Sequence, residues 1–171
     1  QILIQEAIGA PRPVYAHIPL ILASDKSKLS KRHGAVSVME FKEEGYLPDA
    51  LINFLALLGW NPGDDREIFN MDELVKAFSL DHIQKGGAVF NKEKLNWINK
   101  EYIKKLPEDR LLAEIEARLP AHILSAPQYS SERLSRASRV IMEKIHTFGE
   151  VKAMAEAGDL SHFFEAPTPE K

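Results

Sequence analysis

A short basic loop carries the residues of this sequence that are best suited to chemistry. Lys28 and Lys31 stand three residues apart, with Ser30 between them and Arg32 and Gly34 after them. Ammonium groups attract phosphoryl oxygens, a hydroxyl can donate a hydrogen bond to them, and a glycine lets such a loop close over a ligand. The loop therefore suits phosphate, although by composition alone a Lys/Arg run is more often a solvated turn.

The charge of the chain is distributed unevenly. The 171 residues have a net charge of −3, which argues against a protein that coats nucleic acid without selectivity. Residues 1–34, however, carry five basic and two acidic side chains, so the rest of the chain is acidic. The average hides a basic patch around the loop.

Several classes of protein and site are excluded or disfavoured by composition. No apolar run approaches the roughly 20 residues that span a bilayer, so we expect no membrane partner and a cytoplasmic protein. The chain has no cysteine, and its six histidines are too scattered for metal-ligand spacing, so we expect no zinc and no other metal site. His33, beside the loop, is expected to form a hydrogen bond within the loop.

The elements that must position the loop are a helix end and a strand. Residues 1–10 show the pattern of a helix end that stops at Gly9. Residues 14–22 are a mostly apolar run of strand length, which we expect to deliver the chain to the loop.

Helical patterns dominate after the loop. Pro48 suits a first helical position, and the helix that follows is apolar almost all round, so we expect it to be buried at the centre of its domain. Asn70 with Glu73, and Asn91, have the spacing of N-caps. The predicted helices cover residues 38–44, 48–58, from 70 onward, 81–85, from 91 to about 106, 107–119 and about 131–146.

Two helices carry basic residues that could contact RNA. The helix from Asn91 carries five lysines, and its predicted RNA-binding face consists of Lys92, Lys94, Trp97, Lys100 and Lys104. Such a face can bind an RNA backbone and stack a base. The alternative is that Trp97 packs against a neighbouring domain and the lysines are merely solvated.

The helix near residues 131–146 has Arg133, Arg136 and Arg139 at every third position. These arginines could meet phosphates. They could equally pair with Glu132 and Glu143, and each such surface pair is worth less than about 1 kcal/mol.

The order of residues in the loop adds information that composition lacks. Lys28-Leu29-Ser30-Lys31-Arg32 resembles the second signature loop of class I aminoacyl-tRNA synthetases, known by the letters KMSKS. Leu29 and Arg32 replace the consensus methionine and final serine, and both replacements are ordinary in the glutamyl branch. The chain resembles bacterial glutamyl-tRNA synthetase from residue 14 to about 105, in segments 24–39, 45–51, 57–60, 78–80 and 90–95.

The resemblance implies a mainly α fold in three parts. Residues 1–34 would be the C-terminal end of a Rossmann-type α/β catalytic domain, with the KMSKS loop. Residues 35–106 would form a helical stem-contact domain, and residues 107–171 would begin a helical anticodon-binding domain.

The resemblance also implies the reaction and its partners. Glutamate would attack the α-phosphate of ATP, supplied with Mg²⁺, and the terminal ribose of tRNA(Glu) would then accept the glutamyl group. Lys31 would stabilise charge on the phosphates as pyrophosphate leaves, Lys28 would assist, and all five loop residues would contact ATP. Losing one such preorganised donor typically costs about 3 kcal/mol, or roughly a hundredfold in rate. DNA is not an expected partner, and we expect a monomer.

One family feature has no match in the sequence. The first class I signature, a His-x-Gly-His-like element, does not occur, and the chain starts without methionine. We therefore expect a C-terminal portion of the enzyme that begins just before the loop and is inactive alone. A portion of glutaminyl-tRNA synthetase, or a noncatalytic tRNA-binding helical module, are the alternatives.

Overall fold

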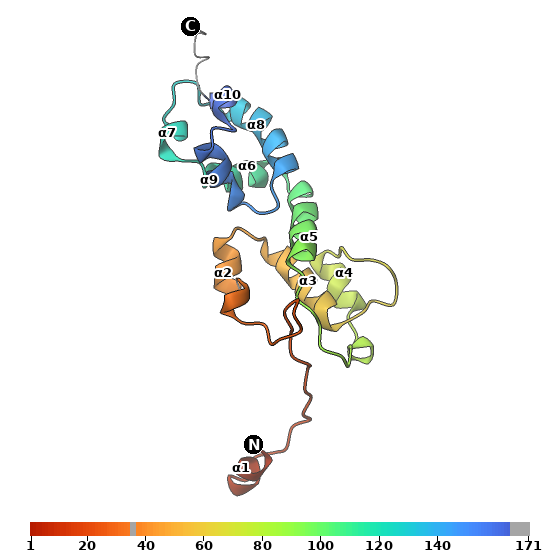
Figure 1. Ribbon diagram of the computed structural model, residues 1–171. Helices are drawn as coiled ribbons and strands as arrows, with labels where there is room; N and C mark the ends of the chain where they lie inside the picture. The colour runs from red at the N-terminus through yellow and green to blue at the C-terminus, as the bar shows by residue number, and fades with distance from the viewer. Residues whose placement is uncertain (35–36, 165–171) are drawn as a thin grey trace.

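The computed structural model describes residues 1–34 and 37–164, and helices dominate this part of the chain (Figure 1). Two short 3-10 helices, η1 and η2, accompany the α-helices. The elements are α1 (Ile2–Ala7), η1 (Lys31–His33), α2 (Val38–Glu43), α3 (Pro48–Gly59), α4 (Met71–Ala77), η2 (Leu80–His82), α5 (Lys92–Lys104), α6 (Glu108–Glu116), α7 (Ala121–Leu124), α8 (Ser131–Lys144), α9 (Glu150–Glu156) and α10 (Ser161–Phe164).

The mainly helical fold is confirmed, and the local reasons for it are those the sequence indicates. Pro48 occupies the first turn of α3, and the side chain of Asn70 accepts a hydrogen bond from the amide of Glu73 at the start of α4. Asn91 caps α5 through the amide of Lys94 at 3.0 Å. Such side chains satisfy amides that the first turn of a helix leaves unpaired.

The predicted strand over residues 14–22 is wrong. Within the described residues, only isolated bridges occur, and Leu22 is the one residue of the segment that takes part in them. Val14 is fully exposed and Ile18 is 73% exposed. A strand needs a neighbouring backbone to complete its hydrogen bonds, and among the described residues such partners are found at the end of the segment, for Ile21 and Leu22.

The burial of α3 also differs from the expectation. Its outer face exposes Ile52 and Leu55, at 43% and 40%. Asn53, the polar interruption in the apolar run, is completely buried. It accepts a hydrogen bond from the amide of Phe69 at 2.7 Å and donates one to the carbonyl of Glu67 at 2.9 Å. Because both polar ends of the amide find partners, burying it is tolerated.

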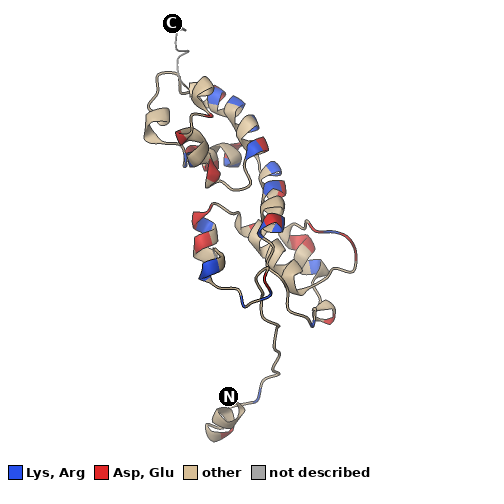
Figure 2. Ribbon diagram, in the orientation of Figure 1, with Lys and Arg blue, Asp and Glu red and all other residues tan. Residues whose placement is uncertain are grey.

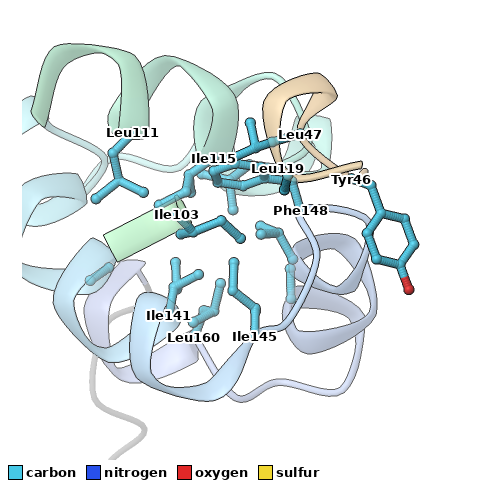
Figure 3. Close-up of a cluster of buried hydrophobic side chains, with 14 of the residues drawn as sticks. Tyr46, Leu47, Ile103, Leu111, Ile115, Leu119, Ile141, Ile145, Phe148 and Leu160 are labelled. Carbon is cyan, nitrogen blue, oxygen red and sulfur yellow. The ribbon is translucent and has the colours of Figure 1, made fainter. Parts of the chain in front are cut away.

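A single large hydrophobic core runs from α2 to α10. It contains residues of the turn between α2 and α3, such as Leu47, together with residues far along the chain, such as Phe148 and Phe164. Figure 3 shows Leu47, Ile103, Ile115 and Phe148 in one cluster. A second, smaller cluster consists of Trp60, Phe69 and Leu74. The helix α5 contributes to the large core from near both of its ends, through Leu95 and Ile103.

Three short helices, α7, α9 and α10, are not predicted from the sequence. They have four, seven and four residues, which is too short for a helical period to be recognised. The boundary predicted between residues 34 and 35, and the end of the third predicted domain, border on residues outside the described part of the chain.

Candidate functional site

The basic loop is anchored to the segment that leads into α5. Leu22 forms an antiparallel bridge with Lys28 and a parallel bridge with Val89. The amide of Leu22 donates to the carbonyl of Ala88 at 2.8 Å, and the amide of Phe90 donates to the carbonyl of Leu22 at 2.8 Å. The start of the loop and the start of α5 are thus held together by backbone hydrogen bonds.

A tight turn brings the chain from Ala23 to Lys28. The amide of Ala23 donates to the carbonyl of Ser27 at 2.8 Å, and Lys26 adopts a positive φ of 63°. The amide of Ser27 also donates to Oδ1 of Asp25 at 2.9 Å. Hydrogen bonds from Ser27, aided by the charges of His33 and Arg32, hold the pKa of Asp25 below its usual value. Asp25 is therefore an anion at the edge of the loop.

Ser30 and His33 close the second half of the loop. The amide of Ser30 donates to Nδ1 of His33 at 3.1 Å, and the Ser30 hydroxyl lies 3.1 Å from the same nitrogen. The expected hydrogen-bonding role of His33 within the loop is therefore confirmed. The three residues that follow Ser30 form η1, which carries Lys31 and Arg32.

The cationic groups of the loop face solvent. The Lys31 side chain is 83% exposed, and its Nζ lies 3.9 Å from Oε1 of Glu40 on α2. Lys28 and Arg32 are exposed as well, whereas Leu29 and Ser30 are half-buried. A contact of 3.9 Å between exposed groups is weak, so Lys31 can leave Glu40 for a stronger anion at little cost.

A cavity of about 410 Å³ lies against the inner side of the loop. Residues of the loop form one wall, and the first residues of α5 with the segment before it form the other. Its lining consists of Ala23, Ser24, Leu29, His33, Val89, Phe90, Asn91, Lys92 and Glu93. The helix N-terminus adds a partial positive charge to this wall.

Sequence reasoning missed the contribution of residues 89–93 to this cavity. Asn91 was expected only to cap α5, and Val89 and Phe90 had no expected role. Their place depends on the bridge between Leu22 and Val89, which joins residues 67 positions apart. The one sequence feature that marks this segment is the resemblance of residues 90–95 to the same family, although these residues lie outside the KMSKS loop.

Each of the four predicted RNA-binding lysines on α5 has a partner within the protein. Lys92 pairs with Glu44 at 2.9 Å, Lys94 with Glu67 at 2.5 Å, and Lys104 with Glu101 at 2.7 Å. Nζ of Lys100 donates to the carbonyl of Glu143 at 2.5 Å. Their side chains, like Trp97 at 42% exposure, still reach the surface.

The arginines of α8 have fewer partners. Arg136 pairs with Glu132 at 2.5 Å, as the alternative interpretation of this helix expects, with both side chains more than 70% exposed. Arg133 donates to the carbonyl of Phe163 at 3.1 Å. Arg139 is exposed, and no ion pair links it to another residue of the described chain.

The candidate residues form two groups. Of the predicted tRNA-binding residues on α5 and α8, Lys92 lies nearest the loop, because it lines the same cavity as Leu29 and His33. The C-terminal end of α5 adjoins α8, and Figure 2 shows basic and acidic residues alternating along both helices. The basic residues of α8 and of the C-terminal end of α5 therefore lie in a part of the molecule separate from the loop (Figure 2).

Two features are absent from the described residues: a metal-binding cluster and a membrane-spanning helix. No group of three or more His, Asp or Glu side chains there could hold a metal ion. No helix among them is long and apolar enough to cross a membrane.

Comparison with known proteins places the chain in a family. Residues 1–97, more than half of the chain, match the family of tRNA synthetases class I (E and Q), catalytic domain. A glutamate–tRNA ligase from Dechloromonas aromatica is 44% identical over 170 residues, which is 99% of this chain and 35% of that protein. One from Nitrosospira multiformis is 42% identical over 167 residues, or 98% of this chain and 34% of that protein.

Solved structures agree with the sequence relatives. A glutamate–tRNA ligase from Elizabethkingia meningosepticum in complex with its amino acid superimposes with a TM-score of 0.76 at 31% identity. The match covers 99% of this chain and 36% of that one. The chain thus spans about a third of the length of the relatives it matches. The match over residues 1–97 shows that the chain belongs to the glutamyl and glutaminyl class I tRNA synthetases.

Proposed function

We propose that this chain is the portion of a glutamate–tRNA ligase that presents the KMSKS loop to ATP and contacts the body of the tRNA. The proposal rests on one observation: a chain of this synthetase family carries a loop with the KMSKS residue order. Its residues follow the order of the signature, the Lys31 ammonium is exposed to solvent, and Leu29 and His33 of the same loop segment line a cavity of about 410 Å³. The curated relatives named above are glutamate–tRNA ligases, which favours glutamate over glutamine.

The role of the loop in the reaction is electrostatic stabilisation of the phosphates. Glutamate attacks the α-phosphate of ATP, the bond to pyrophosphate breaks, and glutamyl adenylate forms. Negative charge grows on the leaving phosphates, where the Lys31 ammonium offsets it and Lys28 assists. Leu29, Ser30 and Arg32 complete the contact with ATP. The Ser30–His33 hydrogen bonds and the pairing of Leu22 fix the loop backbone before ATP arrives, so less reorganisation is required during reaction.

Mg²⁺ enters this proposal as part of the ATP substrate. Mg²⁺ usually keeps several waters and binds through substrate phosphates, so we assign the ion to the phosphates of ATP. Residues that bind glutamate, and the first class I signature, are not assigned to any position of this sequence. We accordingly expect no adenylate synthesis by the 171-residue chain alone.

The tRNA would lie along the edge formed by α5 and α8. We assign Lys92, Lys94, Trp97, Lys100 and Lys104 of α5 to the tRNA body, followed by the three arginines of α8. The ion pairs of the lysines involve exposed groups and are worth less than about 1 kcal/mol each, so phosphates can replace the carboxylates. This assignment divides the chain as the sequence predicts, into a catalytic end (1–34), a stem-contact part (35–106) and the start of an anticodon-binding part (107–171). We expect a cytoplasmic monomer.

A chimeric ligase tests the role of the loop. Residues 1–171 replace the aligned stretch of the Dechloromonas ligase, which matches 99% of the chain. The chimera should catalyse ATP–pyrophosphate exchange in the presence of tRNA(Glu) and glutamate. Lys31→Ala should lower this exchange roughly a hundredfold, because one preorganised cation is lost at the phosphates.

The matched control is Lys152→Ala, which removes a lysine of α9 whose side chain is 67% exposed and which is far from the loop in sequence. It should leave exchange within about twofold of the parent chimera, since surface substitutions usually change little. Equal effects of the two substitutions, or normal exchange by Lys31→Ala, would contradict the assignment of the loop. A noncatalytic module would give no exchange even in the unsubstituted chimera.

A further inference from the structure

The turn between α2 and α3 is in direct backbone contact with the turn between α8 and α9. A β-carbon placed on Gly45 would lie 2.2 Å from the amide nitrogen of Gly149, and one placed on Gly149 would lie 2.5 Å from the carbonyl oxygen of Glu44. The amide of Phe148 donates to the carbonyl of Gly45 at 3.1 Å, and the amide of Gly149 donates to the carbonyl of Glu44 at 3.3 Å. Only glycine permits this approach at either position.

Asn99 joins both turns to the middle of α5. It is completely buried, and its Oδ1 accepts a hydrogen bond from the amide of Leu47 at 2.8 Å. Its Nδ2 donates to the carbonyl of His146 at 2.6 Å. One amide therefore satisfies a backbone group from each turn, which fixes both turns against the same helix.

Hydrophobic packing also holds the two turns together. Figure 3 shows Leu47 and Phe148 within the cluster that also contains Ile103 and Ile145. The Arg118 guanidinium lies over the Phe148 ring, 5.3 Å from its centre. A close-packed interior does not deform continuously, so α2, α5 and α8 cannot shift independently here. We call this contact of residues 44–47, Asn99 and residues 146–149 the junction.

The junction lies between the two groups of candidate residues. At one end of α5, the bridge from Leu22 to Val89 holds the KMSKS loop. In the middle of α5, Asn99 holds the turn that follows α8. Both the loop and the arginines of α8 are therefore positioned relative to one helix.

On the basis of the proposed function, we propose that the junction positions α8 so that its arginines engage the same tRNA molecule as α5 and the loop. Gly45, Asn99 and Gly149 are positioning residues and touch no substrate. Two surfaces that are held at a fixed separation bind one ligand more tightly than the same surfaces on a loose connection, because the second contact is intramolecular. A substitution that loosens the junction should therefore remove this gain in tRNA affinity, while the basic residues of α5 and α8 stay unchanged.

A distance measurement tests the junction without tRNA. The chain has no cysteine, so spin labels can be placed on Val75→Cys of α4 and Ser131→Cys of α8, both at exposed positions. The parent chain should give one narrow distribution of distances. Gly149→Ala should displace or broaden it. Gly59→Ala, where an added β-carbon meets nothing within 4 Å, is the control and should leave it unchanged.

A double-mutant cycle tests the consequence for tRNA. In the parent chain at low salt, Arg136→Ala with Arg139→Ala should weaken tRNA(Glu) binding about tenfold. Gly149→Ala should weaken it to a similar extent, and adding the two arginine substitutions to Gly149→Ala should have less than about a twofold further effect. Loss of packing stability alone would not produce this non-additivity in molecules that circular dichroism shows to be folded.

Asn99→Ser replaces Gly149→Ala in both experiments if that variant does not fold, because a serine cannot reach both turns. Additive losses of tRNA affinity, or an unchanged distance distribution, would overturn the role of the junction and leave the proposed function standing. Failure of the parent chain to bind tRNA at low salt would instead overturn the tRNA surfaces of the proposed function.

Discussion

Asn53 shows how one polar residue can organise a buried region. Besides its bonds to Phe69 and Glu67, its Oδ1 lies 2.9 Å from the hydroxyl of Tyr102, which also contacts the carbonyl of Phe69. The loop before α4 is thus tied to α3 and α5 by two side chains. Burial raises the pKa of Tyr102 to about 12, and the charges of Asp49 and Glu73 add to the effect.

Alkaline pH should weaken this arrangement. The pKa of Tyr102 in the folded protein exceeds that of an unfolded tyrosine, about 10, so the folded state holds its proton more tightly. The stabilisation is complete below pH 10 and is lost as pH rises toward about 12. Tyr102→Phe should lower the free energy of unfolding by about 1 kcal/mol at pH 8. Between pH 10 and 12, urea titrations should show that the free energy of unfolding declines less in this variant than in the parent chain.

The control for that measurement is Leu80→Ala, at a position that is 75% exposed. It should keep the pH dependence of the parent. A decline as steep in Tyr102→Phe as in the parent would assign the alkaline effect to Tyr46 and Tyr129, whose pKa values burial also raises.

At the scale of elements, α5 and α8 carry similar numbers of basic side chains, but those of α5 have more partners within the protein. The lysines of α5 all have partners, and the pKa of Lys104 is raised chiefly by its hydrogen bond with Glu101. On α8, Arg136 has only an exposed carboxylate, and Arg139 has no described ion pair. A phosphate must displace a carboxylate or, at Lys100, a backbone carbonyl on α5, whereas it meets Arg139 directly.

This difference predicts unequal effects on tRNA binding. Arg139→Ala should weaken binding more than Lys104→Ala, because the lysine must first leave Glu101. It should also reduce the slope of log K against log salt concentration by about one. Binding measured from 50 to 200 mM salt gives both quantities.

Arg66→Ala is a suitable control, since Arg66 pairs with Asp64 at 2.8 Å in the loop before α4 and has no proposed tRNA role. Its slope should match that of the parent chain. If Lys104→Ala has the larger effect, α5 rather than α8 would supply the principal phosphate contacts.

At the scale of the molecule, one core spans segments that the family resemblance assigns to two domains. Ile103 of α5, Leu111 and Ile115 of α6, and Ile141 of α8 all belong to the cluster that begins at Phe41. Segments that share a close-packed core lose their stability together when any part of it opens.

We therefore expect residues 37–164 to unfold in one transition. Urea unfolding followed by far-UV circular dichroism reports all helices, whereas tryptophan fluorescence reports Trp60 and Trp97. The two curves should coincide, with one midpoint. Two separate midpoints would show that the predicted domain boundary near residue 106 also divides the chain energetically.

Local sequence determined most of the helices and the identity of the loop. Caps such as Asn70 and Asn91 act within one helical turn, and the buried stripe of α8, formed by Leu134, Ala137 and Ile141, is set by spacing along a single helix. The KMSKS residues are contiguous, so their order can be recognised without any knowledge of the fold. His33 also acts within its own loop, and its role was predicted for the same reason.

Tertiary structure alone decided the features that depend on distant residues. Whether residues 14–22 form a strand depends on a neighbouring backbone, and whether Asn53 is buried depends on the groups of Glu67 and Phe69 that meet it. The cavity beside the loop requires the bridge from Leu22 to Val89, and the junction requires Gly45 and Gly149 to meet across 104 positions. Periodicity and caps report on a few neighbouring residues, whereas these contacts arise only when the chain packs.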